Sequence, residues 1–128
     1  MNAARIMVVD DEDGVREVAR RILSRGGYDV VAARDGEDAL SLIVDDGREI
    51  DLLLTDVIMP RMSGKELAQR LVELGTEVKV LYMSGYTDRL IGLDEVDALV
   101  EKPFNRDVLL EAVARSLEED EPEAPAEP

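Results

Sequence analysis

A short apolar run that ends in an acid constrains the fold of this chain more than any other feature. Residues Leu52 to Thr55 are apolar or suited to a strand, Asp56 follows them, and Met59-Pro60 stops regular structure soon afterwards. A run that is apolar at successive positions is typical of a strand covered on both faces. Such strands occur in parallel sheets, where ligands bind at the carboxyl ends of the strands. We therefore expect Asp56 to lie at that edge.

The rest of the chain alternates predicted strands with predicted helices. Further strands are expected at residues 5–9, 28–33, 78–83 and 98–101, and helices at 14–25, 35–44, 63–74, 88–93 and 105–117. The helix at 88–93 has the weakest pattern. Five strands alternating with five helices predict an α/β fold, with a five-stranded parallel sheet and helices on both faces. The doubly wound strand order 2-1-3-4-5 is the common solution for five strands.

Capping residues and apolar stripes support these helices. Asp35 and Asn105 are placed to cap the second and the last helix, and Ser63 with Glu66 forms a capping box at the third. The side chains expected to face the core are Val15, Val18, Ala19, Ile22 and Leu23 in the first helix, Ala39, Leu40 and Ile43 in the second, Leu67, Leu71 and Leu74 in the third, and Val108, Leu109, Ala112, Val113 and Leu117 in the last.

Length and composition predict one folded domain with an acidic tail. A chain of 128 residues with 45% hydrophobic content is large enough for one core, which we assign to residues 1–118. Residues 119–128 contain only Glu, Asp, Pro and Ala. Because that composition buries too little apolar surface to compensate for ordering the chain, we expect a disordered tail there.

Charge and missing residue types exclude several functions. The net charge of −15 argues against direct contact of this chain with nucleic acid or anionic membranes, so proteins and cations are the expected partners. The chain lacks cysteine, a span of about 20 apolar residues and a signal-peptide pattern, which predicts a cytoplasmic protein. The absence of histidine excludes histidine-based catalysis, histidine zinc ligands and a phosphohistidine donor within this chain.

Acids at two neighbouring strand ends predict a cation site. Asp10 and Asp11 follow the first strand, and the expected strand order places them beside Asp56. Three carboxylates in close proximity repel one another unless a cation neutralises them, and removal of one should then stabilise the metal-free protein. A few carboxylate ligands completed by water suit Mg²⁺ better than Ca²⁺, which takes more oxygen ligands. Each acid taken alone also fits an ordinary solvated loop position, as Ser84 and Lys102 do at their own strand ends; the joint placement carries the prediction.

The same residues carry a resemblance to a known family. The chain resembles the receiver domains of response regulators, of the chemotaxis-regulator type with a flavodoxin-like fold, from Arg5 to about Leu117. The similarity rests on Val-Val-Asp-Asp-Glu at 8–12, Asp-Val-Ile-Met-Pro at 56–60, Ser-Gly at 63–64, Met-Ser-Gly-Tyr at 83–86 and Lys-Pro-Phe at 102–104.

That resemblance implies a phosphorelay function and a role for each site residue. Asp56 would be the phosphoacceptor, Asp11 and Asp56 would bind Mg²⁺ together with the backbone carbonyl of Ile58, and Asp10 would assist through water. Ser84 and Lys102 would contact the phosphoryl group. The donor would be a histidine kinase or a histidine phosphotransfer protein. The output to a downstream protein would use the loop after Ser84 and the face formed by residues 88–93, 98–101 and the last helix.

One position departs from the family pattern, and a second bears on how long a phosphoryl group on Asp56 would last. An aromatic residue often precedes the lysine by three positions in this family and swings inward on activation, whereas Leu99 stands there in this chain. Leucine offers no hydroxyl or ring for such a switch, so Tyr86 is an alternative contributor, as well as a candidate partner contact or packing residue. The bulk of the Ile58 side chain beside the phosphoryl site is expected to affect the access of water, and hence the lifetime of the phosphoryl group, through either faster or slower hydrolysis.

Three functions compete at this point. The first is a phospho-accepting receiver, either as a single-domain regulator or as the C-terminal receiver of a hybrid histidine kinase, which the stretch 83–88 resembles. Such a domain assists its own phosphorylation and dephosphorylation and turns over no separate substrate, although a hybrid parent would be a kinase. The second is an aspartate-nucleophile, Mg²⁺-dependent phosphatase, which usually has Asp-x-Asp-x-Thr where residues 10–14 read Asp-Asp-Glu-Asp-Gly. The third is a protein-binding receiver that is never phosphorylated.

Overall fold

The fold is that of a parallel sheet between two layers of helices. A computed structural model describes residues 3–47, 49–85 and 98–118. In chain order the elements are β1 (Arg5–Val9), α1 (Asp13–Arg25), β2 (Asp29–Ala33), α2 (Gly36–Asp46), β3 (Leu52–Asp56), α3 (Gly64–Glu73), β4 (Lys79–Ser84), β5 (Leu99–Glu101) and α4 (Arg106–Glu118).

The sheet has the predicted topology. Its strands run in the order β2-β1-β3-β4-β5, and every neighbouring pair is parallel. In the register between β1 and β3, Val9 lies opposite Thr55, and between β3 and β4, Asp56 lies opposite Met83. Parallel pairing brings the carboxyl ends of all five strands to one edge, so the residues that end or follow β1, β3, β4 and β5 are neighbours.

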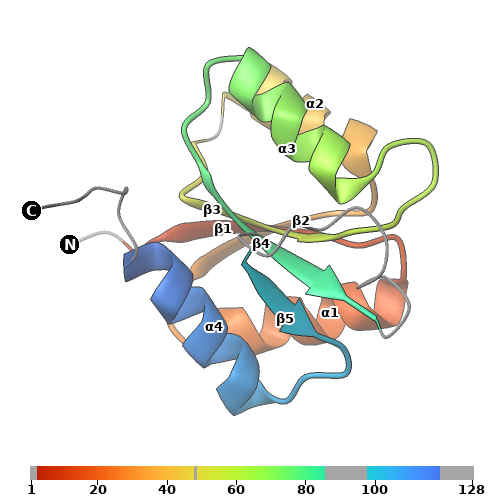
Figure 1. Cartoon of the computed structure of the whole chain (residues 1–128). Coiled ribbons are helices and arrows are strands. Elements are labelled where there is room, and N and C mark those ends of the chain that lie inside the picture. The colour runs from red at the N-terminus through yellow and green to blue at the C-terminus, as the bar shows by residue number, and fades with distance from the viewer. Residues whose placement is uncertain (1–2, 48, 86–97, 119–128) are drawn as a thin grey trace, which may run out of the picture.

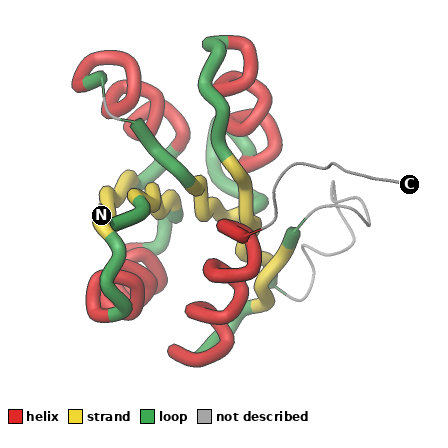
Figure 2. Tube along the Cα trace, turned by 90° about the vertical axis from the view of Figure 1, so that its left-hand side faces the viewer, coloured by secondary structure: helices red, strands yellow, loops and turns green. Residues whose placement is uncertain are grey.

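Helices cover both faces of the sheet, as the sequence predicts. Helices α2 and α3 lie on one face, and α1 and α4 lie on the other (Figure 1); Figure 2 shows the same two helical layers from the side. The strand side chains alternate between two buried clusters: Leu53 packs with α2 and α3, while Leu52 and Leu54 pack with α1 and α4. Each of these leucines is fully buried, which stabilises the fold by about 2 kcal/mol per side chain.

All three predicted N-cap side chains make their capping bonds, whereas the reciprocal half of the predicted capping box, a bond from the Ser63 N–H to the Glu66 side chain, is not formed among the described residues. The Asp35 side chain accepts a hydrogen bond from the Asp38 backbone N–H at 2.8 Å, and Ser63 Oγ accepts one from the Glu66 N–H at 3.1 Å. Asn105 Oδ1 accepts one from the Val108 N–H at 2.9 Å. Each cap satisfies a backbone donor that has no partner within its own helix, which explains why the helices begin where they do.

Three of the apolar residues expected in the core are exposed. Val18, Leu74 and Val108 keep 49%, 55% and 46% of their surface accessible. Val18 lies at the edge of the apolar face of α1, whose buried positions are Ala19 and Leu23. Leu74 lies beyond the end of α3, so the helical period no longer applies to it. Val108 is in the first turn of α4, whose buried stripe is Leu109, Val113 and Ser116. Those three predictions were therefore wrong.

Some predictions fall outside the described residues. They are the helix at 88–93, the contribution of Tyr86 and the acidic tail at 119–128. Within the three described ranges, no helix has both the length and the apolar character that a membrane span needs.

Candidate functional site

Four strand ends bring the predicted site residues to one edge of the sheet. Asp56 is the last residue of β3 and Ser84 the last of β4, while Asp10 directly follows β1 and Lys102 follows β5. The backbone N–H of Lys102 donates to the Ser84 carbonyl at 2.9 Å, which extends the pairing of β4 with β5 up to the site. The sheet therefore places these four residues at one edge through backbone pairing, independently of the contacts between their side chains.

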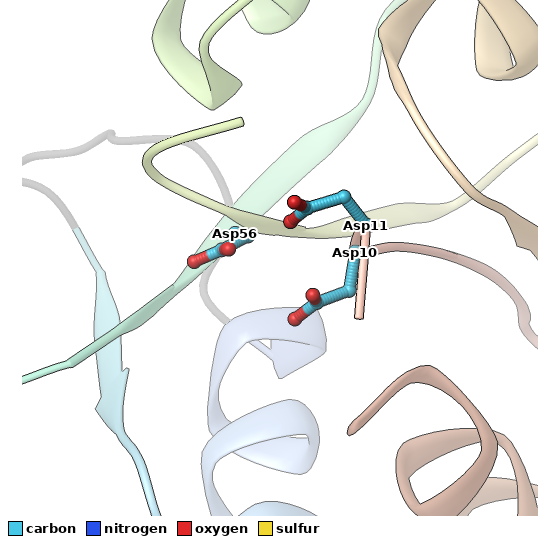
Figure 3. A group of neighbouring side chains, drawn as sticks. All are labelled: Asp10, Asp11 and Asp56. Atoms are coloured by element: carbon cyan, nitrogen blue, oxygen red, sulfur yellow. The ribbon is translucent and has the colours of Figure 1, made fainter. Parts of the chain in front are cut away.

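The three predicted acids form one cluster. One carboxylate oxygen from each of Asp10, Asp11 and Asp56 can be chosen so that all three lie within 4.8 Å of one another. Figure 3 shows Asp10 and Asp11 extending from the end of β1 toward the side on which Asp56 lies. Asp10 is fully buried and Asp56 is only 6% exposed, whereas Asp11 is exposed. The cluster thus has a buried pair of acids and one acid open to solvent.

Asp10 is held by contacts to its backbone and to its side chain. Its N–H donates to the Ala33 carbonyl at 3.3 Å, and its Oδ1 accepts from the Glu12 N–H at 2.8 Å. Its own carbonyl accepts from the Arg16 guanidinium at 2.7 Å. A buried acid in this setting has little freedom to rotate, so the loop from Asp10 to Glu12 has a fixed shape.

Lys102 supplies the positive charge that the buried acids need. Its Nζ lies 3.1 Å from Asp10 Oδ2 and 3.2 Å from Asp56 Oδ1, and its side chain is 18% exposed. Burial by itself lowers the pKa of Lys102, but its ion pairs with the negative charges of Asp56 and Asp10 outweigh that effect and raise the pKa above its ordinary value. Lys102 is therefore an ammonium ion at neutral pH and bridges the two acids.

The acid cluster fits a small divalent cation. Mg²⁺ binds oxygen at about 2.1 Å, so two directly bound oxygens are at most about 4.2 Å apart. A set of oxygens within 4.8 Å needs only small side-chain movements, or one contact through water, to meet that limit. The donors are all carboxylate oxygens, the ligand type that Mg²⁺ prefers. Ile58, the proposed source of a backbone ligand, lies in the loop directly after β3, and its side chain is exposed.

Ser84 lies at the same edge, but its hydroxyl has a local partner. Ser84 Oγ donates to the Gly85 carbonyl at 3.0 Å, and the residue is fully buried. Leu99 is partly buried and lies opposite Tyr82 in the register of β4 with β5. In this structure the hydroxyl of Ser84 thus bonds to the backbone directly after β4.

Two contacts that shape the site were missed from the sequence. Arg16 reaches back from α1 to the Asp10 carbonyl. Gly64, the first residue of α3, packs so closely on β3 that a Cβ added to it would lie 2.2 Å from the Asp56 carbonyl oxygen. The sequence does hold signals for both, namely a basic residue within the first helical turn after the acids and a glycine directly after a cap. Neither signal identifies its contact from the sequence alone, because each contact depends on how a helix packs against a strand end in the fold.

Comparison with known proteins matches this geometry to a family and to longer relatives. The profile of the response regulator receiver domain matches residues 6–114. The response regulator MprA of Mycobacterium bovis (strain BCG / Pasteur 1173P2) is 39% identical over 129 residues, which cover 98% of this chain and 55% of MprA. MprA of Mycolicibacterium vanbaalenii is 41% identical over 110 residues, which cover 83% of this chain and 47% of that protein. The chain spans about half the length of these curated relatives.

Solved structures agree with the sequence match. FixJ-N superposes with a TM-score of 0.75 at 31% identity, covering 92% of this chain and 96% of FixJ-N. The receiver domain of the hybrid histidine kinase CckA superposes with a TM-score of 0.75 at 34% identity, covering 90% of this chain and all of that domain. With the sheet order, the acid cluster and the profile match in agreement, this chain belongs to the response regulator receiver domain family.

Proposed function

We propose that Asp56 accepts a phosphoryl group from a phosphohistidine on another protein or domain, in a reaction that depends on Mg²⁺. The observation that carries this proposal is the position of Asp56 itself. It ends a central strand, contacts the Lys102 ammonium at 3.2 Å, and shares one cluster with Asp10 and Asp11. A carboxylate is a weak nucleophile toward phosphorus, so fixed positive charge beside it is what the reaction needs.

The proposed step is a transfer between two nucleophiles. A carboxylate oxygen of Asp56 forms a bond to phosphorus as the bond from phosphorus to the donor's imidazole nitrogen breaks, and the electron pair of that bond stays with the imidazole. The product on Asp56 is an acyl phosphate, a mixed anhydride that water hydrolyses. Lys102 stabilises the negative charge on the phosphoryl oxygens because its ammonium is already held at the site.

The acid cluster supplies the metal site in this proposal. Asp11 and Asp56 would hold Mg²⁺ together with the carbonyl of Ile58, and Asp10 would contribute through water. When bound, the ion neutralises charge on the phosphoryl oxygens. We expect Asp11→Ala to reduce the affinity for Mg²⁺ more than Asp10→Ala, which calorimetric titration of both variants measures. Equal losses would contradict the distinction between the two acids.

Ser84 links phosphorylation to a change of surface. Its hydroxyl bonds the Gly85 carbonyl in this structure, and a phosphoryl group on Asp56 adds strong acceptors that compete for it. Redirecting that hydroxyl would free the Gly85 carbonyl at the start of the loop after β4. We propose that this loop, β5 and α4 form the output surface for a downstream protein, with a histidine kinase or a phosphotransfer protein as the donor.

The setting of the domain is also a proposal. MprA and CckA are named as a response regulator and a hybrid histidine kinase, so receivers similar to this one occur in both settings. The net charge of −15 favours protein partners for this chain. The proposed cytoplasmic location rests on the residue content, which includes no cysteine and no long apolar run. The proposed absence of nucleic-acid contacts rests on that charge alone and covers only this chain, since the curated relatives are about twice as long.

Membership of the receiver family argues against the phosphatase alternative, and one experiment tests whether the receiver is phosphorylated. The protein is incubated with phosphoramidate and Mg²⁺, and its intact mass is measured. We expect one added phosphoryl group in the wild type and none in Asp56→Asn. The matched control is Asp107→Asn, which removes an exposed acid of the same type and should be labelled normally. Labelling that persists in Asp56→Asn would refute the assignment of Asp56, and no labelling of the wild type would favour the unphosphorylated receiver.

A further inference from the structure

Arg16 makes a contact that the proposed phosphorelay chemistry does not itself require. One guanidinium nitrogen donates to the Asp10 carbonyl at 2.7 Å, and the other pairs with the Asp13 carboxylate. Only 20% of the Arg16 side chain is exposed. The guanidinium thus connects the end of β1 to the first turn of α1. The loop between them carries Asp10 and Asp11.

The bonded carbonyl is what makes this contact relevant to Asp11. The Asp10 carbonyl and the Asp11 N–H belong to one planar peptide group, so a hydrogen bond to the carbonyl fixes the orientation of the backbone that enters Asp11. The Asp11 side chain is exposed, and across the described residues it takes part in no hydrogen bond or ion pair. Its position in the cluster therefore depends on its backbone.

We propose that Arg16 is a positioning residue for the cation site, which it shapes by holding the Asp10–Asp11 peptide. This inference rests on the proposed function, since it assigns a role toward the same Mg²⁺ site. Asp13 has its own part, because its carboxylate neutralises the guanidinium that would otherwise repel a cation. Arginine suits this position because its planar fork reaches two acceptors at once.

Charge and positioning predict opposite effects of removing Arg16. If Arg16 acted only as a nearby positive charge, its removal would strengthen the binding of a cation. If it positions Asp11, removal weakens binding despite the lost repulsion. Losing a residue that orients a metal ligand typically reduces affinity 10-fold to 100-fold. We expect Arg16→Gln to raise the Mg²⁺ dissociation constant by about 10-fold.

A matched control on the same helix separates the two effects. Arg20→Gln changes the net charge by the same amount, but Arg20 pairs with Glu17 on the exposed face of α1. MgCl₂ and CaCl₂ are titrated calorimetrically at constant ionic strength into the wild type, Arg16→Gln, Arg16→Lys and Arg20→Gln. We expect Arg20→Gln to bind Mg²⁺ as the wild type does or slightly more tightly, and Arg16→Lys to be intermediate because an ammonium bonds one acceptor without the fork.

Cation selectivity gives a readout that a loss of stability alone would not change. Mg²⁺ demands near-octahedral geometry, whereas Ca²⁺ tolerates flexible sites, so Arg16→Gln should lose more affinity for Mg²⁺ than for Ca²⁺. In the metal-free protein, the Glu12 amide hydrogen, which bonds Asp10 Oδ1, should exchange faster in Arg16→Gln than in Arg20→Gln. If Arg16→Gln does not fold, Arg16→Lys carries the same comparison.

The outcomes distinguish this inference from the proposed function. A wild type that neither binds Mg²⁺ nor accepts phosphate at Asp56 overturns the proposed function and the inference with it. A wild type that does both, with an Arg16→Gln variant that binds Mg²⁺ as tightly as Arg20→Gln, overturns the inference alone. Weaker Mg²⁺ binding with a lower preference for Mg²⁺ over Ca²⁺ supports it.

Discussion

Replacing Gly64 by alanine should disturb Asp56 through direct contact with its backbone. A Cβ at residue 64 would lie 2.2 Å from the Asp56 carbonyl oxygen and 3.1 Å from Thr55 Cγ2. Real Cβ atoms essentially never come closer than 3.0 Å to another heavy atom, so α3 and β3 must separate by at least about 0.8 Å, the difference between 3.0 and 2.2. The atom that is met is backbone, so a side-chain rotation cannot relieve the contact.

The structure indicates the size of both consequences. Overpacking of this kind lowers the free energy of unfolding by about 2 kcal/mol, and the melting temperature of a domain of this size by on the order of 10 °C. A shift near 1 Å at a reacting group reduces a rate by roughly 100-fold. Because the displaced carbonyl belongs to Asp56, Gly64→Ala should slow its phosphorylation by phosphoramidate by about that factor.

The control is the same substitution at a glycine with open space. Gly14 lies in the first turn of α1, and a Cβ there would meet nothing within 4 Å. Gly14→Ala should match or slightly exceed the wild type in melting temperature, because alanine favours a helix over glycine by up to about 1 kcal/mol. Thermal unfolding followed by circular dichroism and the rate of mass gain measure the two effects. If Gly64→Ala melts and reacts like Gly14→Ala, the close approach of α3 to Asp56 is refuted.

Three further predictions follow from the charges and the backbone. Lys102→Met leaves Asp10 and Asp56 buried without the ammonium that pairs with them, and should lower the free energy of unfolding of the metal-free protein by about 3 kcal/mol. The exposed control Arg115→Gln should change this free energy little. Urea unfolding measures both variants, and equal losses would contradict a stabilising role of the Lys102 ion pairs. The pKa of Lys102 is raised on folding, so its own contribution is fully present below its ordinary value of 10.5 and is lost as the pH rises through the folded value. The stability difference between wild type and Lys102→Met should therefore shrink in that alkaline range. Arg61 has a φ of 71°, so Arg61→Val should be less stable than Arg61→Gly by roughly 1–2 kcal/mol, and equal stabilities would show that the backbone there is unstrained.

The sheet was predictable because its signals are local. Each apolar run specifies a strand, each cap specifies where a helix begins, and the rules for parallel connections leave one common strand order. The placement of Asp56 and Asp10 at one edge follows from that order alone. Side-chain burial was less predictable, because the elements packed against a helix decide how many of its apolar residues are covered. Val18 and Val108 lie just outside the buried rows of α1 and α4, which other residues of those helices fill.

The internal contacts of the site were beyond the sequence for a different reason. The bridge from Lys102 to Asp10 and Asp56 depends on distances of 3.1 and 3.2 Å between strands that are far apart in the chain. Its formation also changes an expectation. Mutual repulsion of three acids predicts that losing Asp11 or Asp56 stabilises the metal-free protein, but Asp56 already has the ammonium beside it. The gain should therefore be seen for Asp11→Ala, which removes an exposed acid without a bonded partner in the described chain, and not for Asp56→Ala.

The formal charges of the site explain why a divalent cation is needed there. They do not explain a preference for Mg²⁺ over Ca²⁺. Three carboxylates and the Lys102 ammonium leave the cluster at −2, the sum of −3 and +1, which one divalent ion balances. Mg²⁺ and Ca²⁺ carry the same charge, so the choice between them depends on how rigidly the ligands are held. Asp56 is held by its strand and Asp10 by three hydrogen bonds, whereas Asp11 is held through its backbone. Cation selectivity at this site should therefore depend mainly on the loop that Arg16 fixes.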